Sequence, residues 1–371
     1  MRIADVIARA VSVPRLAQFR PKTAHGERAT SDYVIVQVRT EDGPVGLGEA
    51  TVDRAWSGED AISTESLING TVRDLLLGAN AGDWAEVAAR LGRLTMHRPF
   101  LRAALEMACL DILGKQAGVP VSMLIGGARR TGIPTKFVVP ARDPETATRI
   151  AATAAERGAL ALKVKVGIDI AQDAARVAAV REVLPEMHLT VDANEGWGVD
   201  EARAALRRMD DFGVAVVEQP VARHAWAALA ALRHTGRAAI AGDESIWSEA
   251  DIVTAAAHSA LDIACLYPGK CGGIRRAMTV AAIAGAHGMR VSVGSNLELG
   301  VGSAAMAHML AALPQLSTAM PADLIGPLYH EHSLVTDDSF VRFDGATCPA
   351  GPGLGVALDE AAVEHYRLRQ R

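Results

Sequence analysis

The order of hydrophobic and polar positions divides the chain into two main regions. In the first region, the stretch SDYVIVQVRTEDGPVGLGEA alternates apolar and polar residues on both sides of the turn-forming letters EDG. We therefore expect two antiparallel strands, Tyr33–Arg39 and Val45–Glu49. Helical periodicity follows in GDWAEVAARLGRL and in FLRAALEMACLDILGKQAG, which is closed by Gly118 and Pro120. Strands followed by helices predict an α+β domain over residues 1–130.

From about Pro134, a short β-branched run alternates regularly with a helical stretch. We expect the first of these helices to begin with Asp143 as its N-cap and Pro144 in its first turn, and to end at Gly158. The runs that begin the units are KFVV, ALKVKVG, HLTVDAN, VAVVEQP, AAIAGDES, LDIACLYPG and MRVSVGSN. Seven units, with an eighth expected, predict an α/β protein whose parallel sheet closes into a (β/α)8 barrel over residues 131–347. An open doubly wound sheet is the alternative.

The last segment, residues 348–371, is rich in Gly and Pro and then briefly helical. We expect it to leave the barrel and return to the first domain.

Composition and charge narrow the classes of partner. Of the 371 residues, 50% are hydrophobic and 22% are charged, which is enough for a sizeable core. The formal net charge is −5 and no long run of Lys or Arg occurs, which argues against nucleic acid and anionic membrane as partners. No stretch reaches the roughly 18 apolar residues that span a bilayer.

The N-terminus and the cysteines predict the compartment. The first letters, MRIADVIARAVSVPR, lack the apolar core and cleavage site of a signal peptide. Four cysteines have neither metal-binding nor disulfide spacing: Cys109, Cys265, Cys271 and Cys348. We expect reduced thiols in a cytoplasmic protein. The alanine-rich helices of the barrel favour a homo-oligomer.

Polar side chains recur at the ends of the expected barrel strands. They are Lys163 and Lys165, Asp192, Glu218, Asp243 and Tyr267. From Lys165 onward the steps are 27, 26, 25 and 24 residues, and each step is one strand–helix unit. Because a parallel barrel places its active site at the carboxyl ends of its strands, we expect these side chains to meet at one rim.

Three acids at one rim predict a cation site, because converging carboxylates repel one another unless a cation neutralises them. Ligands that are all oxygen favour Mg²⁺ over zinc or copper, and Mn²⁺ could substitute. Asp243 and Glu244 compete for the third position, because side chains alternate along a strand and only one of them can point inward. Spacing does not decide between the two.

The two lysines in KVK are two positions apart and therefore share one face of their strand. Ammonium groups side by side lower each other's pKa, so one lysine can act as a base while its neighbour assists. A carboxylate held by Mg²⁺ has an acidified α-proton. The pattern therefore predicts removal of that proton by lysine, with the cationic groups stabilising the enediolate.

These residues resemble the muconate-lactonizing-enzyme subgroup of the enolase superfamily, within the mandelate racemase/muconate lactonizing enzyme family. LKVKVG is similar to its K-x-K motif, and VDANEGW, VVEQP and AGDES are similar to its three ligand motifs. The resemblance covers essentially the whole chain. It implies a modified TIM barrel whose N-terminal domain acts as a cap. Loops of the cap would close over the substrate, with Arg20, His25 and Trp56 as candidates to contact it.

The resemblance also implies roles for individual residues. The implied metal ligands are Asp192, Glu218 and Asp243, so the choice between Asp243 and Glu244 falls on Asp243. Lys165 is the implied acid/base, with Lys163 assisting it. The implied supporting or substrate-binding residues are Asn194, Lys270, Ser295 and Glu298.

One position departs from the family pattern. The family usually carries a second lysine five residues before a Gly pair, where this chain has Tyr267. A shift of the chain that turns Lys270 inward as the acid is an alternative. Without the second lysine, we expect a one-base reaction on a small carboxylate, either a muconate-lactonizing-like cycloisomerisation or a syn-dehydration. The alternatives are a racemase or epimerase of an amino-acid or hydroxy-acid derivative, with Tyr267 as second acid/base, and a catalytically silent binding protein.

Overall fold

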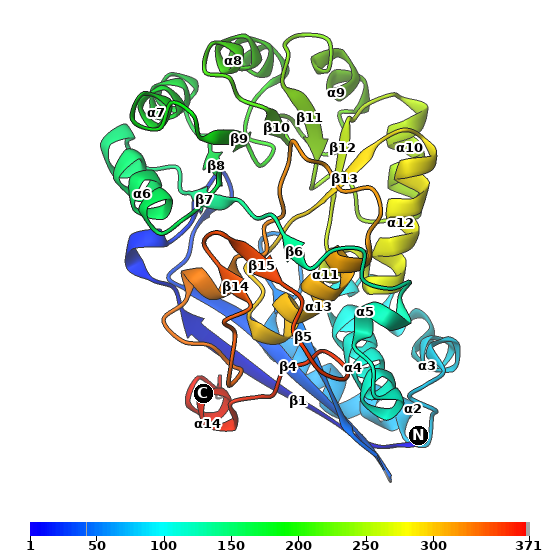
Figure 1. Ribbon diagram of the computed structural model, residues 1–371. Helices are drawn as coiled ribbons and strands as arrows, with labels where there is room; N and C mark the ends of the chain where they lie inside the picture. Colours follow the sequence, from blue (N-terminus) through cyan, green and yellow to red (C-terminus); the bar gives the residue numbers. More distant parts are fainter. Residues whose placement is uncertain (42, 369–371) are drawn as a thin grey trace.

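The computed structural model describes residues 1–41 and 43–368 (Figure 1). The first domain contains an antiparallel sheet in the order β1-β4-β5, with bounds Ile3–Pro14, Thr30–Thr40 and Val45–Val52. The two expected strands are therefore confirmed, and each is longer in the structure than the range predicted from the sequence. Strand β1, which was not predicted, pairs with β4 along its length. Asp42, in the predicted EDG turn, lies outside the described residues.

Helices cover this sheet. They are α1 (Ala61–Leu67), η2 (Ile68–Val72), α2 (Arg73–Leu76), α3 (Trp84–Leu91), η3 (Gly92–Thr95), α4 (Pro99–Ala117) and α5 (Val121–Leu124). Helix α4 ends at Gly118, as predicted. Glycine is required where α4 crosses β5, because a Cβ at Gly48 would lie 1.9 Å from the backbone oxygen of Ala104. The close approach buries most of α4 against the sheet.

The second region is a parallel barrel. Its sheet runs in the order β13-β12-β11-β10-β9-β8-β7. From β7 to β13 the bounds are Phe137–Val139, Ala161–Lys165, His188–Asp192, Val216–Glu218, Ala239–Gly242, Ile263–Leu266 and Arg290–Val293. The outer helices are α6 (Pro144–Glu156), α7 (Ile170–Val183), α8 (Val199–Asp211), α9 (Trp226–Leu232), α10 (Glu249–Ala257), α11 (Pro268–Cys271), α12 (Ile274–Ala286) and α13 (Gly300–Ala312). Figure 1 shows the longer helices surrounding the strands.

An irregular eighth segment closes the ring. Ser317 donates its N–H to Val291 O of β13 at 2.8 Å, and Lys136, just before β7, donates its N–H to Ala322 O at 3.0 Å. Residues 316–323 therefore bridge the two edge strands of the sheet. The predicted barrel is confirmed, and the open doubly wound alternative is excluded.

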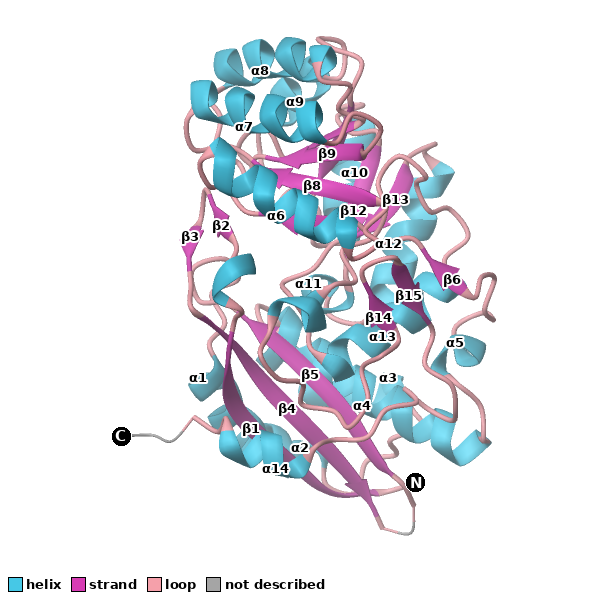
Figure 2. Cartoon of the chain, turned by 60° about the vertical axis from the view of Figure 1, so that its left-hand side comes forward, coloured by secondary structure: helices cyan, strands magenta, loops and turns pink. Residues whose placement is uncertain are grey.

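The remaining short elements connect the two domains. They are η1 (Ala17–Phe19), β2 (Lys22–Thr23), β3 (Gly26–Glu27), β6 (Gly132–Ile133), η4 (Gly326–Tyr329), β14 (Val341–Arg342), β15 (Gly345–Thr347) and α14 (Glu360–His365). The β2–β3 hairpin extends from the first domain toward the barrel (Figure 2). The last described residues lie along β1, where Leu368 donates its N–H to Ala10 O at 2.8 Å. Within the described residues, no helix has the length and apolar character to cross a bilayer.

Candidate active site

One cavity lies between the first domain and the carboxyl ends of the barrel strands. Eight of the residues singled out from the sequence line it: His25, Trp56, Lys163, Lys165, Asp192, Asn194, Asp243 and Ser295. Strand register brings the barrel residues together, because Lys165 pairs with Asp192 across β8 and β9, and Asp192 pairs with Glu218 across β9 and β10. The strand-end pattern in the sequence therefore corresponds to one rim of the barrel.

The two lysines are tied to the acids around them. Lys165 Nζ donates to Asp192 Oδ2 at 2.5 Å and to Asn194 Oδ1 at 2.8 Å. Lys163 Nζ donates to Glu218 Oε2 at 3.1 Å and to Asp323 Oδ2 at 2.5 Å. Asp192 Oδ2 also lies 3.4 Å from Lys163 Nζ, so the two amines share this carboxylate, while Glu218 and Asp323 contact only the Lys163 amine of the two.

These contacts set the protonation of the site. Burial lowers the pKa of Lys163, but the carboxylates of Asp323, Glu218 and Asp192 outweigh burial, and the net pKa lies well above its ordinary value. This is the opposite of the lowering expected for neighbouring ammonium groups, because the acids lie in direct contact with Lys163. Burial raises the pKa of Asp192, but Lys165 and Lys163 hold it at about 2, so this carboxyl is ionised.

Two of the three acids expected to bind a metal, Glu218 and Asp243, lie close enough to share a divalent cation, whereas Asp192 Oδ2 contacts the two lysines. One ligand atom each of Glu218, Asp243 and Cys265 lie within 4.8 Å of one another. Glu218 Oε1 is buried and has no hydrogen-bond partner among the described residues, so an acceptor is available for a cation. Burial raises the pKa of Cys265 well above its ordinary value, so the thiol stays protonated and is a poor ligand. The available donors are therefore carboxylate oxygens.

Asp243 and Glu244 turn to different partners. Lys270, on α11, donates through Nζ to Asp243 Oδ1 and to the backbone oxygen of Cys265, the latter at 2.9 Å. Glu244 Oε1 instead accepts from Asn194 Nδ2 at 2.9 Å. Asp243 therefore faces Glu218, while Glu244 supports the residue that holds Lys165.

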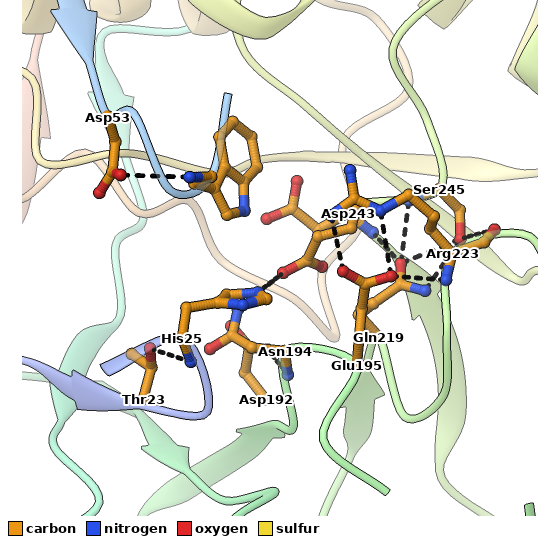
Figure 3. A network of polar contacts seen from close by, with 12 residues as sticks. Thr23, His25, Asp53, Asp192, Asn194, Glu195, Gln219, Arg223, Asp243 and Ser245 are labelled. Carbon is orange, nitrogen blue, oxygen red and sulfur yellow. Dashed lines mark hydrogen bonds and ion pairs between the residues drawn. The ribbon is translucent and has the colours of Figure 1, made fainter. Parts of the chain in front are cut away.

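A histidine from the first domain joins this network. His25, in the turn of the β2–β3 hairpin, lies with Nε2 3.1 Å from Glu244 Oε1. Figure 3 shows the imidazole directed from the hairpin toward the strand ends that carry Asp192 and Asn194. The bond to Glu244 raises the pKa of His25 above its ordinary value. The hairpin is therefore connected to Lys165 through Glu244 and Asn194.

The chain following β9 bends sharply to make these contacts. Asn194 and Glu195 both have left-handed backbones, with φ of 44° and 66°. Such a conformation is strained for a residue other than glycine, although asparagine tolerates it best. Glu195 is fixed in turn by Arg223, whose Nη2 donates to Glu195 Oε2 at 2.7 Å. Hydrogen bonds therefore hold both residues of the strained turn in place.

Tyr267 lies on the opposite side of the barrel from the lysines. Its side chain is fully buried, and its hydroxyl has no hydrogen-bond partner among the described residues. Trp56 lines the cavity and stacks on Tyr267, with ring centroids 5.9 Å apart, and on Trp247, with centroids 4.8 Å apart. Burial raises the pKa of Tyr267 well above its ordinary value. An indole rather than an ionisable group therefore faces the cavity on this side.

The other residues singled out from the sequence differ in how close they lie to the cavity. Glu298 is buried and accepts from Ser295 Oγ at 2.5 Å, and burial raises its pKa to about 7. Arg20 lies 4.0 Å from Glu27 and does not line the cavity. Sequence reasoning missed the buried pair Lys136 and Asp323, whose Nζ and Oδ1 lie 2.9 Å apart. The sequence signal that could have revealed this pair was Asp323, an acid at the end of the irregular eighth segment.

The comparisons with known proteins agree with this geometry. The chain matches the family model of the mandelate racemase/muconate lactonizing enzyme N-terminal domain over residues 6–126, and the enolase C-terminal domain-like model over residues 145–362. A chloromuconate cycloisomerase from Cupriavidus pinatubonensis is 32% identical over 338 residues, which cover 90% of each chain. An L-Ala-D/L-Glu epimerase from Bacillus subtilis is 31% identical over 96% of this chain and 97% of its own.

The fold is shared as well. The crystal structure of 2-chloromuconate cycloisomerase from Rhodococcus opacus 1CP matches with a TM-score of 0.94 and 29% identity, covering 100% of both chains. Both domain models and the relatives span the cap and the barrel together. The chain therefore belongs to the mandelate racemase/muconate lactonizing enzyme family, and it is a metal-dependent enzyme of the enolase superfamily.

Proposed function

We propose that the protein removes the α-proton of a small carboxylate substrate, with Lys165 as the base and Asp192, Glu218 and Asp243 as ligands of Mg²⁺. The observation that carries the proposal is the direct contact of Lys165 with Asp192 at the rim of the cavity. Mg²⁺, or Mn²⁺ in its place, would draw charge from the substrate carboxylate and stabilise the enediolate. Oxygen ligands alone support this choice of metal.

The surrounding residues support distinct roles for the two lysines. Lys165 lines the cavity, and Asn194 and Asp192 orient its amine toward the same rim. Lys163 is held by Glu218 and Asp323 with a raised pKa, so it stays protonated and supplies positive charge near the substrate carboxylate. Lys270 stays on Asp243 and orients that carboxylate.

A one-base reaction fits the site best. In an eight-membered ring, β8 and β12 stand four positions apart in either direction, so Lys165 and Tyr267 occupy opposite sides. Tyr267 is buried beside Trp56 and offers no group to the cavity. We therefore favour a cycloisomerisation like that of the chloromuconate relatives, or a syn-dehydration in which Lys165 acts twice.

An epimerase or racemase is the second candidate. The relatives include an L-Ala-D/L-Glu epimerase and an N-succinyl-L-Arg/Lys racemase. An epimerase or racemase needs an acid/base group on the side of the cavity where Tyr267 lies. The Tyr267 hydroxyl has no hydrogen-bond partner among the described residues, which argues against that role. A catalytically silent binding protein would not need Lys165 at the rim. We further propose a cytoplasmic homo-oligomer, for which the four free cysteines support the reducing compartment.

Exchange of the α-proton tests the proposal. The enzyme would be incubated with Mg²⁺ and a panel of carboxylic acids in D₂O, with product formation and α-deuterium followed by NMR. Lys165→Met should lose activity by about 10²–10⁴-fold or more, because the general base is gone. Lys115→Met makes the same chemical change on α4, outside the cavity, and should retain activity. A Lys165→Met variant with the wild-type rate would show that the base is elsewhere.

A further inference from the structure

A second group of metal-binding side chains lies beside the cavity and shares no residue with the proposed Mg²⁺ site. His25 from the β2–β3 hairpin, Glu195 from the turn after β9 and Glu244 after β11 each offer one ligand atom, and these atoms lie within 4.8 Å of one another. In Figure 3 the side chains of His25 and Glu195 approach each other from the hairpin and from the turn. A ligand of all three side chains would therefore join the first domain to the barrel.

Glu244 shows where a partner is missing. Its side chain is fully buried, and its Oε1 accepts from Asn194 Nδ2 at 2.9 Å and lies 3.1 Å from His25 Nε2. Its Oε2 is buried too, but it has no hydrogen-bond partner among the described residues. In the described chain, His25 is the only basic side chain within 4.0 Å of this carboxylate. A buried carboxylate with one free oxygen and only an imidazole beside it is costly unless a cation completes its contacts.

The spacing of the three side chains suits a tetrahedral metal ion. Zn²⁺ holds imidazole nitrogen and carboxylate oxygen at about 2.0–2.2 Å, so two of its ligand atoms lie about 3.4 Å apart. The 3.1 Å between His25 Nε2 and Glu244 Oε1 is already close to that value. Glu195 accepts from Arg223 Nη2 at 2.7 Å and from Arg223 Nε at 3.1 Å. Because each carboxylate oxygen has two lone pairs, Arg223 positions Glu195 and still leaves it an acceptor for a metal.

The donor set also selects the kind of metal. Mg²⁺ prefers oxygen ligands alone, whereas an imidazole combined with carboxylates favours Zn²⁺. We propose that His25, Glu195 and Glu244 bind a second cation, Zn²⁺, which fastens the β2–β3 hairpin to the barrel. Water would hold the fourth position. Because His25 lines the cavity, the bound zinc would restrain the part of the first domain that covers the proposed Mg²⁺ site.

Two measurements on the full chain test this site. Zn²⁺ would be titrated by calorimetry into protein already saturated with Mg²⁺, and we expect a single additional Zn²⁺ to bind. His25→Gln should weaken its binding by about 100-fold or more, because loss of a residue that merely supports a metal ligand already costs about 10- to 100-fold. Zn²⁺ should also slow hydrogen–deuterium exchange of peptides covering Lys22–Glu27 in the wild type, and it should not do so in His25→Gln.

Two control variants separate this site from other places where zinc can bind. His287→Gln makes the same change at an exposed histidine after α12 and should retain the added Zn²⁺. Glu218→Gln removes a ligand of the proposed Mg²⁺ site and should retain it as well, so the two sites can fail separately. Circular dichroism would establish folding, and Glu195→Gln gives the same test if His25→Gln does not fold. Absence of Zn²⁺ binding in the wild type, or binding that survives in folded His25→Gln, would overturn the proposal.

Discussion

At the scale of single residues, the hydroxyl of Tyr267 is the most informative group. It is buried and has no hydrogen-bond partner in the described chain, and its ring stacks on Trp56. Tyr267→Phe should therefore change kcat by less than about threefold. It should leave the free energy of unfolding equal or slightly higher, because the buried hydroxyl makes no hydrogen bond to lose. Steady-state kinetics and urea unfolding measure both effects.

The opposite result would identify a general acid. A loss of about 10²–10⁴-fold in kcat in folded Tyr267→Phe would mean that the hydroxyl moves a proton, and it would favour the epimerase candidate. Trp247→Phe is a suitable control for the aromatic stack, because it alters the other ring on Trp56 and leaves Tyr267 intact. A change shared by both variants would indicate packing.

The strand-end residues could be predicted from the sequence because their spacing repeats with the strand–helix unit. Asp192 and Lys165 follow from this period alone, and their side chains meet in the structure. Asp323 escaped the pattern because the eighth segment has no regular strand. The contact of His25 with Glu244 joins positions 219 residues apart, and no local pattern encodes it. The pKa direction of Lys163 likewise depends on which acids the fold places nearest.

At the scale of elements, the β2–β3 hairpin has three polar contacts with the barrel in the described chain. Ala141 donates its N–H to Lys22 O at 2.9 Å, Arg142 Nη2 donates to Glu27 Oε1 at 2.5 Å, and His25 reaches into the site. His25 bonds to Glu244, which holds Asn194 beside Lys165. His25→Ala should increase hydrogen–deuterium exchange of the hairpin amides, because one of these three contacts, the one at the turn of the hairpin, is lost. It should also lower kcat/KM by about 10-fold, the loss expected for a hydrogen bond to a charged group. Mass spectrometry of peptides covering Lys22–Glu27 measures the first effect.

An exposed histidine provides the control for this variant. His287, at the end of α12, is exposed and outside the cavity lining, so His287→Ala should alter neither the exchange rate nor kcat/KM. Unchanged protection of the hairpin in His25→Ala would mean that other contacts hold it against the barrel.

Helices and strands could be predicted where one face of the element is apolar or where one period repeats along the chain. The barrel strands and helices follow from the repeat, and Gly118 and Asp143 mark helix ends as expected. Strand β1 was missed although its residues alternate between buried and less buried positions, because no turn signal marks its start. Most residues of β1 pair with residues of β4 that lie far away along the chain. The pairing therefore became visible only in the fold.

At the scale of the whole molecule, buried carboxyl groups predict how stability depends on pH. Burial raises the pKa to about 7 at five carboxyl groups: Glu49, Glu59, Glu106, Glu218 and Glu298. The ordinary value is 4.5, so between these values the folded chain binds more protons than the unfolded chain. The free energy of unfolding should therefore fall as pH rises. Buried His308 and His330, with pKa values of about 4, oppose this trend, and their effect fades as pH rises through their ordinary value of 6.5.

The useful window begins at pH 6.5, where the two histidines are only half protonated in the unfolded chain and the carboxyl groups outweigh them. We expect a lower urea midpoint at pH about 7.5 than at pH 6.5. The measurement needs a chelator, because metal binding strengthens with pH and would mask the effect. Glu59→Gln should reduce the difference between the two midpoints, because it removes one of the five titrating carboxyl groups. A midpoint that rises across the window would contradict this prediction.

The indole of Trp56 has one more consequence, for stereochemistry. If Lys165 is the base, as we propose, an amine on one wall of the cavity and the Trp56 ring opposite would let only one of two mirror-image acids present its α-hydrogen for removal. A racemic supply of a chiral substrate would be half consumed, and the acid left in solution would be optically pure.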